Sequence, residues 1–200
     1  MRKINKGEPP EYFASLAAID PIPDWGITRD ISYMLRSHML KEEQGGLCAY
    51  TEMRISAHAS SSHIDHFRKR SLFRELTFDY NNLVVSCNSE FFSAKYKDKR
   101  CRPADYELLI NPVTENPRDH LQYTFTGKVI PRAHSERGAR TIELLNLNHP
   151  ALVERRKHIA LLLSNPRYSN LHDQQVIRLI GEMDSFILAM RRKFRARIKL

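Results

Sequence analysis

The residues best suited to chemistry lie between Cys48 and Cys101, and at the centre of this segment an aspartate directly precedes a histidine, Asp65-His66. The carboxylate of Asp65 is a hard oxygen ligand of the kind that Mg²⁺ prefers. The imidazole of His66 accepts a proton near neutral pH. Metal-assisted hydrolysis of a phosphodiester needs a hard ligand beside a general base, so this pair predicts such a site.

A second group of polar residues follows further along the chain. Asn82 precedes a short apolar run that ends at Cys87-Asn88. A loop and a following helix would bring these side chains back to Asp65-His66. Asn81-Asn82 is also an ordinary turn signal, and an acid or a base alone is most simply a surface residue. The order of all these groups together favours catalysis.

Short segments with a characteristic order extend over most of the chain. They are Met1-Arg2-Lys3-Ile4, Cys48-Ala49-Tyr50, Ile64-Asp65-His66-Phe67-Arg68, Tyr80-Asn81-Asn82-Leu83, Ser86-Cys87-Asn88, Ile110-Asn111-Pro112 and Thr141-Ile142-Glu143-Leu144-Leu145-Asn146-Leu147. In these segments the chain resembles the HNH, or ββα-metal, nucleases. Within them it is similar to the HNH subunit of Septu-type antiphage systems, the PtuB family, which also occurs as a retron effector.

The resemblance implies an α+β fold, a mainly helical domain built around an HNH (ββα-metal) nuclease core. It implies that His66 is the general base and that Asn82 fixes the loop. It also implies that Asp65 and Asn88 hold a divalent metal such as Mg²⁺. The catalytic residues implied by the resemblance are thus His66, Asp65 and Asn82. The expected activity is endonucleolytic cleavage of DNA, RNA or transfer RNA. The expected partners are a Septu-type ATPase and, in retrons, a reverse transcriptase with its RNA–DNA hybrid.

Two departures from the family concern a structural zinc site. Family members usually carry Cys-x-x-Cys where this chain reads Cys48-Ala49-Tyr50-Thr51, and a further cysteine where it reads Ser89-Glu90-Phe91-Phe92. Four thiolates cannot be assembled from Cys48, Cys87 and Cys101. In many HNH proteins the last metal ligand stands where this chain has Phe91, and Asn88 is the nearest suitable side chain. The alternative to an enzyme is a non-catalytic nucleic-acid-binding or assembly subunit on a degenerate HNH scaffold.

Charge points to a polyanionic partner. The chain has 32 Lys and Arg against 23 Asp and Glu, a formal net charge of +9, and such an excess is typical of nucleic-acid binding. A basic protein without such a ligand is the alternative. Five basic residues near the motif are expected to contact nucleic acid: Arg68, Lys69, Lys95, Lys97 and Lys99. For the lysines, the alternative interpretation is a solvated face. The basic segment 191–199 suits nucleic acid, an acidic groove or a disordered tail.

Three cysteines do not form an even disulfide framework, and the first residues lack the apolar stretch of a signal peptide. No apolar run approaches the roughly 20 residues needed to cross a bilayer. A cytoplasmic protein without a membrane role is therefore expected. The sequence also lacks a Gly-rich phosphate loop, so we do not expect it to hydrolyse nucleotides by itself.

The length of 200 residues suits one domain. We expect an N-terminal arm and helix over 1–45, the HNH core over 46–102, and a helical part over 103–200 that packs on the core within the same domain. Trp25, in the arm, either packs against the body or stacks on a base. Helices are expected over 11–18, 29–44, 91–99, from the cap Ser135 to His149-Pro150, over 151–164, and from 173 to 188 or beyond. Strands are expected over 55–58 and 62–67, and a hairpin over 121–130.

Overall fold

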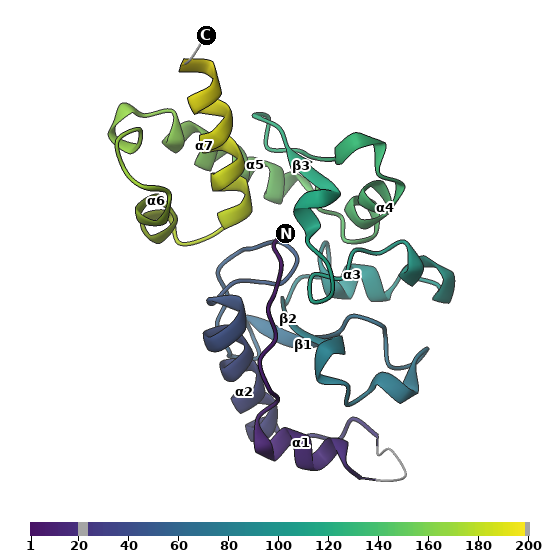
Figure 1. Cartoon of the computed structure of the whole chain (residues 1–200). Coiled ribbons are helices and arrows are strands. Elements are labelled where there is room, and N and C mark those ends of the chain that lie inside the picture. The colour runs from purple at the N-terminus through teal and green to yellow at the C-terminus, as the bar shows by residue number, and fades with distance from the viewer. Residues whose placement is uncertain (20–23, 199–200) are drawn as a thin grey trace.

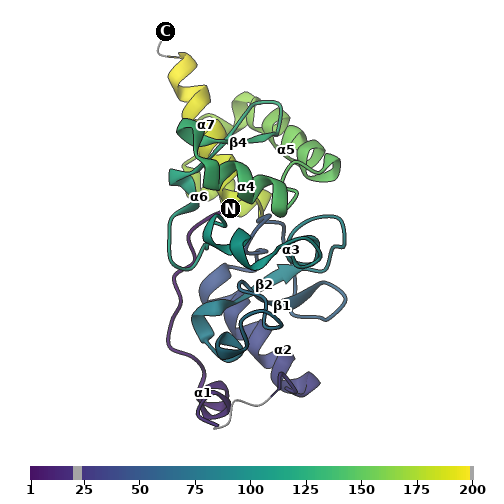
Figure 2. The ribbon, with the colours of Figure 1, turned by 90° about the vertical axis from the view of Figure 1, so that its right-hand side faces the viewer.

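A computed structural model places residues 1–19 and 24–198 of the chain. The chain forms two parts that lie against each other (Figures 1 and 2). The N-terminal part holds the helices α1 (Glu11–Ala17) and α2 (Arg29–His38) and an antiparallel sheet of β1 (Ser62–His66) and β2 (Leu83–Cys87). Helix α3 (Ala94–Asp98) lies at the junction of the two parts.

The second part pairs a small hairpin with four helices. Its elements are β3 (Leu121–Tyr123), β4 (Val129–Pro131), α4 (Glu136–Leu144), α5 (Pro150–Leu163), α6 (Asp173–Ile180) and α7 (Asp184–Ile198). A π-helical turn, Met39–Gln44, extends α2, and short 3₁₀ turns occupy Arg74–Leu76, Tyr80–Asn82, Pro103–Glu107, Pro117–Asp119, Arg132–His134 and Pro166–Tyr168. The structure thus mixes helices with two small sheets.

The helix expected over 29–44 is confirmed as α2 and its π-helical extension. Thr28 caps it, because its hydroxyl accepts a hydrogen bond from the Ile31 amide at 3.2 Å. The extension ends at Gly45, whose φ of 60° suits a residue without a side chain. Gln44 then supports β2, since its amide nitrogen donates to the Val85 carbonyl and its oxygen accepts from the Val85 amide.

Strand β2 is central to the core. Leu83, Val84 and Val85 are all fully buried, and β2 pairs with β1 in the register His63 with Ser86, Asp65 with Val84 and His66 with Leu83. A short strand with apolar residues on both faces must be covered on both sides. β1 therefore carries its polar residues against a closely packed partner, and their positions are fixed by that packing.

Other expectations for the N-terminal part were wrong. Residues 55–58 form no strand, because the serines satisfy the backbone locally: the Ser62 hydroxyl donates to the Ser56 carbonyl, and the Ser61 hydroxyl accepts from the Ser56 amide. Helix α3 begins at Ala94 and not at Phe91, since the preceding Ser93 has a φ of 72°, which a helix does not allow.

In the second part the hairpin expected over 121–130 and the cap at Ser135 are confirmed. Gly127 turns the hairpin with a φ of 78°, and a Cβ there would lie 2.5 Å from the Val153 carbonyl oxygen. The Ser135 hydroxyl accepts from the Gly138 amide at 3.0 Å. The single helix expected from 173 to 188 is wrong, because Gly181 adopts a left-handed conformation and separates α6 from α7.

The two parts are joined by main-chain hydrogen bonds. Glu52 is buried in the turn after Cys48, and its carbonyl accepts from the Met183 amide while its carboxylate accepts from the Ser185 amide. Arg54 donates to the Gly181 carbonyl at 2.6 Å. The beginning of α7 is therefore held by the turn that precedes the β1–β2 sheet.

Candidate functional site

A cavity of about 350 Å³ opens beside β1, the loop that follows it and α3. Two histidines, two carboxylates and several cations meet here. The polar lining includes His63, Asp65, His66, Lys69, Lys95 and Asp98. The structure therefore brings Asp65 and His66 to one cavity with basic side chains, as the sequence predicts.

His66 is held as a neutral imidazole. Its Nε2 lies 3.0 Å from the Thr77 carbonyl oxygen, so the tautomer with a proton on Nε2 donates there and leaves Nδ1 as an acceptor. Burial is the main cause that lowers the pKa of His66, to about 4, with further lowering by Arg70 and Lys97. The Trp25 ring packs edge-on against the imidazole, with centroids 4.6 Å apart. His66 is thus available as a proton acceptor at neutral pH, and Trp25 packs against the body.

Asp65 is engaged by two neighbours. The Tyr50 hydroxyl donates to its carboxylate, and the Lys97 ammonium lies 3.3 and 3.2 Å from its two oxygens. Asp65 is 2% exposed. Burial raises its pKa and Lys97 opposes that rise. In this conformation the carboxylate serves as the counter-ion of a lysine.

The prediction that Lys97 contacts nucleic acid is wrong. Its side chain is fully buried, and its ammonium also donates to the carbonyls of His66 at 3.1 Å and Phe67 at 2.8 Å. Burial lowers the pKa of Lys97, but attraction to Asp65 and Asp98 outweighs burial, and the net shift is upward. Lys97 therefore connects α3 to the end of β1 through a buried ion pair and hydrogen bonds.

Asn82 closes the loop between β1 and β2. Its side-chain oxygen accepts from the Arg68 amide at 2.8 Å, and its nitrogen donates to the carbonyls of Arg68 and Leu76 at 3.0 and 3.2 Å. Its own carbonyl accepts from the Phe67 amide. These bonds tie the beginning of the loop to its far end, which is the position that the predicted loop-fixing residue would need.

Asn88 lies away from the cavity. Its amide continues the ladder to the Ser61 carbonyl, and its exposed side chain donates to the Ala59 carbonyl at 2.9 Å. Ser61 directly precedes β1 and is four residues from Asp65, which is about 13 Å along an extended chain. Asp65 and Asn88 therefore do not share one ion in this structure.

The remaining basic residues predicted to bind nucleic acid lie near the cavity but are partly paired. Arg68 forms an ion pair with Glu107, and both Lys95 and Lys99 pair with Glu90. Lys69 donates to the main-chain carbonyl of Asp98 at 2.9 Å. Exposed pairs of this kind are weak, so these side chains can exchange their present partners for phosphate.

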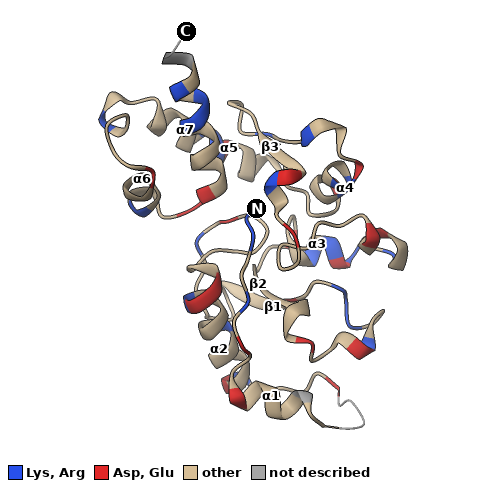
Figure 3. Cartoon of the chain, viewed as in Figure 1, with Lys and Arg blue, Asp and Glu red and all other residues tan. Residues whose placement is uncertain are grey.

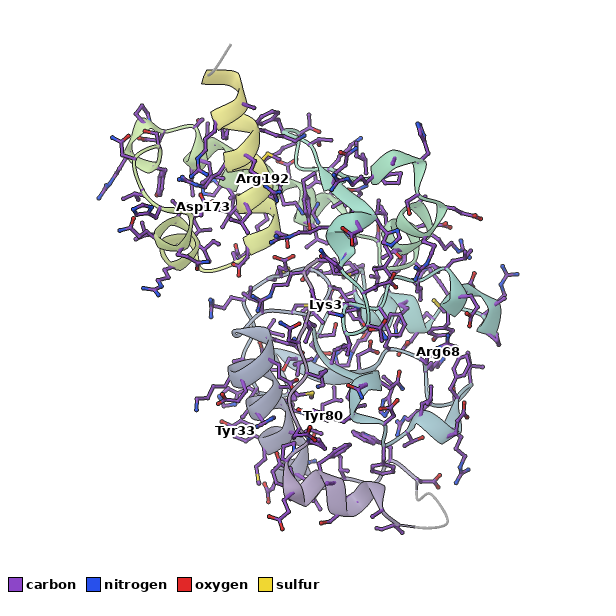
Figure 4. All side chains as sticks on the ribbon, in the orientation of Figure 1. Lys3, Tyr33, Arg68, Tyr80, Asp173 and Arg192 are labelled. Carbon is purple, nitrogen blue, oxygen red and sulfur yellow. The ribbon has the colours of Figure 1, made fainter. Side chains whose placement is uncertain are left out.

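Basic residues also recur along α7 (Figure 3). Arg191 and Arg195 both pair with Asp173, which is labelled in Figure 4. Arg191 also donates to the carbonyls of Tyr168 and Leu171. These two arginines of the segment 191–199 therefore connect α7 to the beginning of α6. Residues 199 and 200 lie outside the described residues.

The thiols of Cys48 and Cys87 meet three hydroxyls, those of Thr51, Ser86 and Ser93. Cys48 Sγ lies 3.4 Å from Ser93 Oγ, Thr51 Oγ1 lies 4.0 Å from Cys87 Sγ, and the Cys87 amide donates to Cys48 Sγ at 3.2 Å. A tetrahedral zinc site with Zn–S bonds of about 2.3 Å would separate its sulfurs by roughly 3.8 Å. Thr51 and Ser93 each lie beside one of the two thiols, so cysteines at these positions would bring four thiols together.

The pKa values of the two thiols in this cluster shift in opposite directions. The hydrogen bond to Cys48 is the main cause that raises the pKa of Cys87, and burial adds to it. Burial also acts to raise the pKa of Cys48, but hydrogen bonds from Cys87, Ser93 and Thr51 outweigh it and lower the pKa. Cys101 makes no such contact among the described residues.

The double substitution Thr51→Cys/Ser93→Cys should create a zinc site. We expect the purified variant to retain one equivalent of zinc per chain and to unfold at a higher temperature than wild type, because a structural zinc site contributes folding free energy. Metal content by mass spectrometry and thermal unfolding with and without chelator would measure both effects. Thr51→Cys/Ser89→Cys is the matched control, and zinc retention by that variant to the same extent would contradict the assignment of Ser93.

The comparisons with known proteins agree with the family named from the sequence. A Septu protein PtuB of Bacillus mycoides (strain KBAB4) is 27% identical over 148 residues, which are 62% of this chain and 50% of that protein. A Septu protein PtuB of Bacillus thuringiensis is 25% identical over 118 residues, which are 54% of this chain and 39% of that protein. The chain is a distant homologue of PtuB. It spans about half or less of each relative's length, and no family model matches it.

Several residues of the site were not selected from the sequence. Asp98 and Arg70 line the cavity, and Tyr50 binds Asp65. His63 could have been found, because strand alternation places it on the same side as Asp65. Asp98 follows Lys95 by three residues, a spacing that puts two side chains on one face of a helix and could have pointed to it.

In residues 1–19 and 24–198 no group of three or more His, Cys, Asp or Glu side chains is arranged to hold a metal ion. Within the same ranges no helix has both the length and the apolar character that crossing a bilayer requires.

Proposed function

We propose that this chain is a nuclease subunit that cleaves nucleic-acid phosphodiesters, with β1, β2 and α3 as its HNH (ββα-metal) core. The similarity to two Septu proteins suggests a role in antiphage defence. An ATPase of the Septu type is the proposed partner, and a retron reverse transcriptase with its RNA–DNA hybrid is the proposed partner in a retron setting. DNA, RNA and transfer RNA are all candidate substrates.

The observation that carries the proposal is the neutral His66 at the wall of a basic cavity. The imidazole is oriented through Nε2 by the Thr77 carbonyl, and its pKa lies well below neutral. A general base must be unprotonated and fixed in direction. The loop that follows β1 is tied by the hydrogen bonds of Asn82, which supports the position of His66.

The proposed reaction uses these groups in order. A phosphodiester enters the cavity beside Arg70 and Lys95, whose positive charges offset the negative charge that develops on phosphorus-bound oxygens. His66 accepts a proton from the attacking water at Nδ1. The oxygen of that water forms a bond to phosphorus, and the bond from phosphorus to the leaving sugar oxygen breaks. The leaving oxygen keeps the bonding electrons and takes a proton from solvent.

The resemblance also leads us to propose a divalent ion such as Mg²⁺ as cofactor. The predicted ligands do not fit it in this structure, because Asp65 is bound by Tyr50 and Lys97 and Asn88 lies on the far end of the ladder. The same observation favours the second candidate function, a non-catalytic nucleic-acid-binding or assembly subunit. The neutral His66 favours the enzyme.

A cleavage assay separates the two functions. The chain, purified alone and together with the products of neighbouring genes, is incubated with plasmid, single-stranded DNA and transfer RNA, with Mg²⁺ or with EDTA. A nuclease would produce new ends that can be mapped by sequencing. Binding of these nucleic acids without any cleavage in the presence of the partner would instead support the non-catalytic subunit.

A further inference from the structure

A second cavity, of about 440 Å³, adjoins the cavity beside β1. Trp25, Arg70 and Ser71 line both cavities, and Arg74 and Thr77 line only the second. Because three lining residues are common to both, the two cavities form one groove that passes the proposed site of cleavage. The volume of the second cavity lies within the range of about 300 to 1,000 Å³ that is typical of ligand pockets, so it has room for one nucleotide.

Two hydrogen bonds connect His66 to the wall of the second cavity. The Thr77 carbonyl oxygen lies 3.0 Å from His66 Nε2, and the Thr77 hydroxyl donates to the Arg74 carbonyl at 2.6 Å. The main chain at Arg74 is therefore fixed relative to the imidazole. Burial is the main cause of the lowered pKa of His66, and the charge of Arg70 adds to it, so Arg70 also lies near the imidazole.

Arg70 and Arg74 belong to a segment of compact turns that the body of the protein holds in place. The Lys69 carbonyl accepts from the Phe73 amide at 3.0 Å. The Phe73 ring packs edge-on against the Tyr106 ring, with centroids 5.2 Å apart. The segment is thus positioned by contacts with the rest of the chain before any ligand binds.

The two arginines are able to bind phosphate. Arg70 is exposed and forms no ion pair among the described residues. Arg74 pairs with Asp24 at 3.0 Å, but these two side chains are 70% and 91% exposed, and exposed pairs contribute little. A guanidinium group presents a planar fork of donors that matches two oxygens of a phosphate. Phosphate can therefore replace Asp24 as the partner of Arg74.

We propose that the second cavity binds the nucleotide next to the scissile phosphate, with the neighbouring phosphate on Arg74 and with Arg70 between the two phosphates. Trp25, whose ring lies against His66 with centroids 4.6 Å apart, supplies an aromatic wall for the sugar or base. The inference rests on the proposed nuclease function for its place in cleavage. A nucleic-acid strand suits the groove better than a protein does, because the groove leads from Arg74 to the proposed general base.

Binding of a short single-stranded oligonucleotide tests the cavity. Fluorescence anisotropy in EDTA measures the affinity of the full chain for DNA and for RNA of the same sequence, over a range of salt concentrations. The variants are Arg70→Gln, Arg74→Gln and the matched control Arg178→Gln, which removes an exposed arginine of α6.

We expect Arg70→Gln and Arg74→Gln each to make the slope of log affinity against log salt less negative by about 0.7, the contribution of one phosphate contact on a single strand. At a salt concentration of about 0.1 M this slope corresponds to about fivefold weaker binding. Arg178→Gln should keep the wild-type slope. Asp24→Asn should bind at least as tightly as wild type, because it removes the carboxylate that competes with phosphate for Arg74.

Thermal unfolding shows whether each variant is folded, and all four substituted side chains are exposed. A wild-type slope in Arg74→Gln would overturn the proposal, as would an equal change in Arg178→Gln or the absence of any binding by wild type. Unchanged oligonucleotide binding by Arg74→Gln, together with lost co-purification of the protein partner, would assign the cavity to a protein contact and would also overturn it.

Failure of the nuclease function gives a different result. Oligonucleotide binding that depends on Arg74, without any cleavage when Mg²⁺ and the partner are present, supports the cavity and contradicts the function. Cleavage by wild type, with unchanged affinity and salt slope in Arg70→Gln and Arg74→Gln, contradicts the cavity and supports the function.

Discussion

His66→Ala is expected to reduce cleavage by about 10²- to 10⁴-fold, because general-base catalysis contributes about that much to an enzymatic rate. The variant loses the only imidazole that the structure orients through the Thr77 carbonyl within the described part of the chain. The measurement is the initial rate of cleavage of the best substrate, with the partner and Mg²⁺ present.

Nucleic-acid affinity and melting temperature are the controls for this variant. His66 also packs against Trp25, so His66→Asn is measured in parallel, since it keeps a polar side chain that cannot act as base. Both variants should bind nucleic acid as wild type does. Cleavage at the wild-type rate by either folded variant would rule out His66 as the base.

Lys97→Met is expected to lower the free energy of unfolding by about 3–5 kcal/mol, because removing one partner of a buried ion pair leaves the other charge uncompensated. Asp65 would then be buried without its cation, and the carbonyls of His66 and Phe67 would lose a donor. Chemical denaturation followed by circular dichroism measures the change.

Lys99→Met is the matched control, because Lys99 is exposed and pairs only with the exposed Glu90 among the described residues. Its effect should stay within about 0.5 kcal/mol. Asp65→Asn provides a second check: in the Lys97→Met background it should cost less than in wild type, since the two residues are coupled. Equal losses for Lys97→Met and Lys99→Met would show that Lys97 is not the buried cation described above.

Features encoded by local chemistry were predicted from the sequence. The cap at Thr28, the end of the helix at Gly45 and the turn at Gly127 each depend on residues that are neighbours in the chain. The meeting of Asp65 and His66 at one cavity was expected from the family resemblance and not from the strand pattern, since alternation sends adjacent side chains to opposite faces. These signals need no knowledge of distant contacts.

Features that depend on distant contacts were not predicted. Lys97 stands among other basic residues and looks like part of a solvated face, and only the position of α3 against β1 shows that it is buried. Ser93 was not connected with Cys48, because the two residues are 45 positions apart in the chain and meet only in the folded structure. The spacing in the sequence did not show that Asn88 pairs with Ser61, which lies four residues before Asp65.

The contact between Glu52 and the beginning of α7 has a practical consequence. Glu52 is buried in the turn that carries Cys48, and it accepts hydrogen bonds from the Met183 and Ser185 amides. A fragment cut after α3 would lose both donors, and the Glu52 carboxylate would keep the Met1 ammonium, 2.6 Å from its Oε1. We therefore expect a shortened version that carries the cavity beside β1 to be less stable than the full chain, unless it keeps the beginning of α7 or supplies substitutes for its first amides.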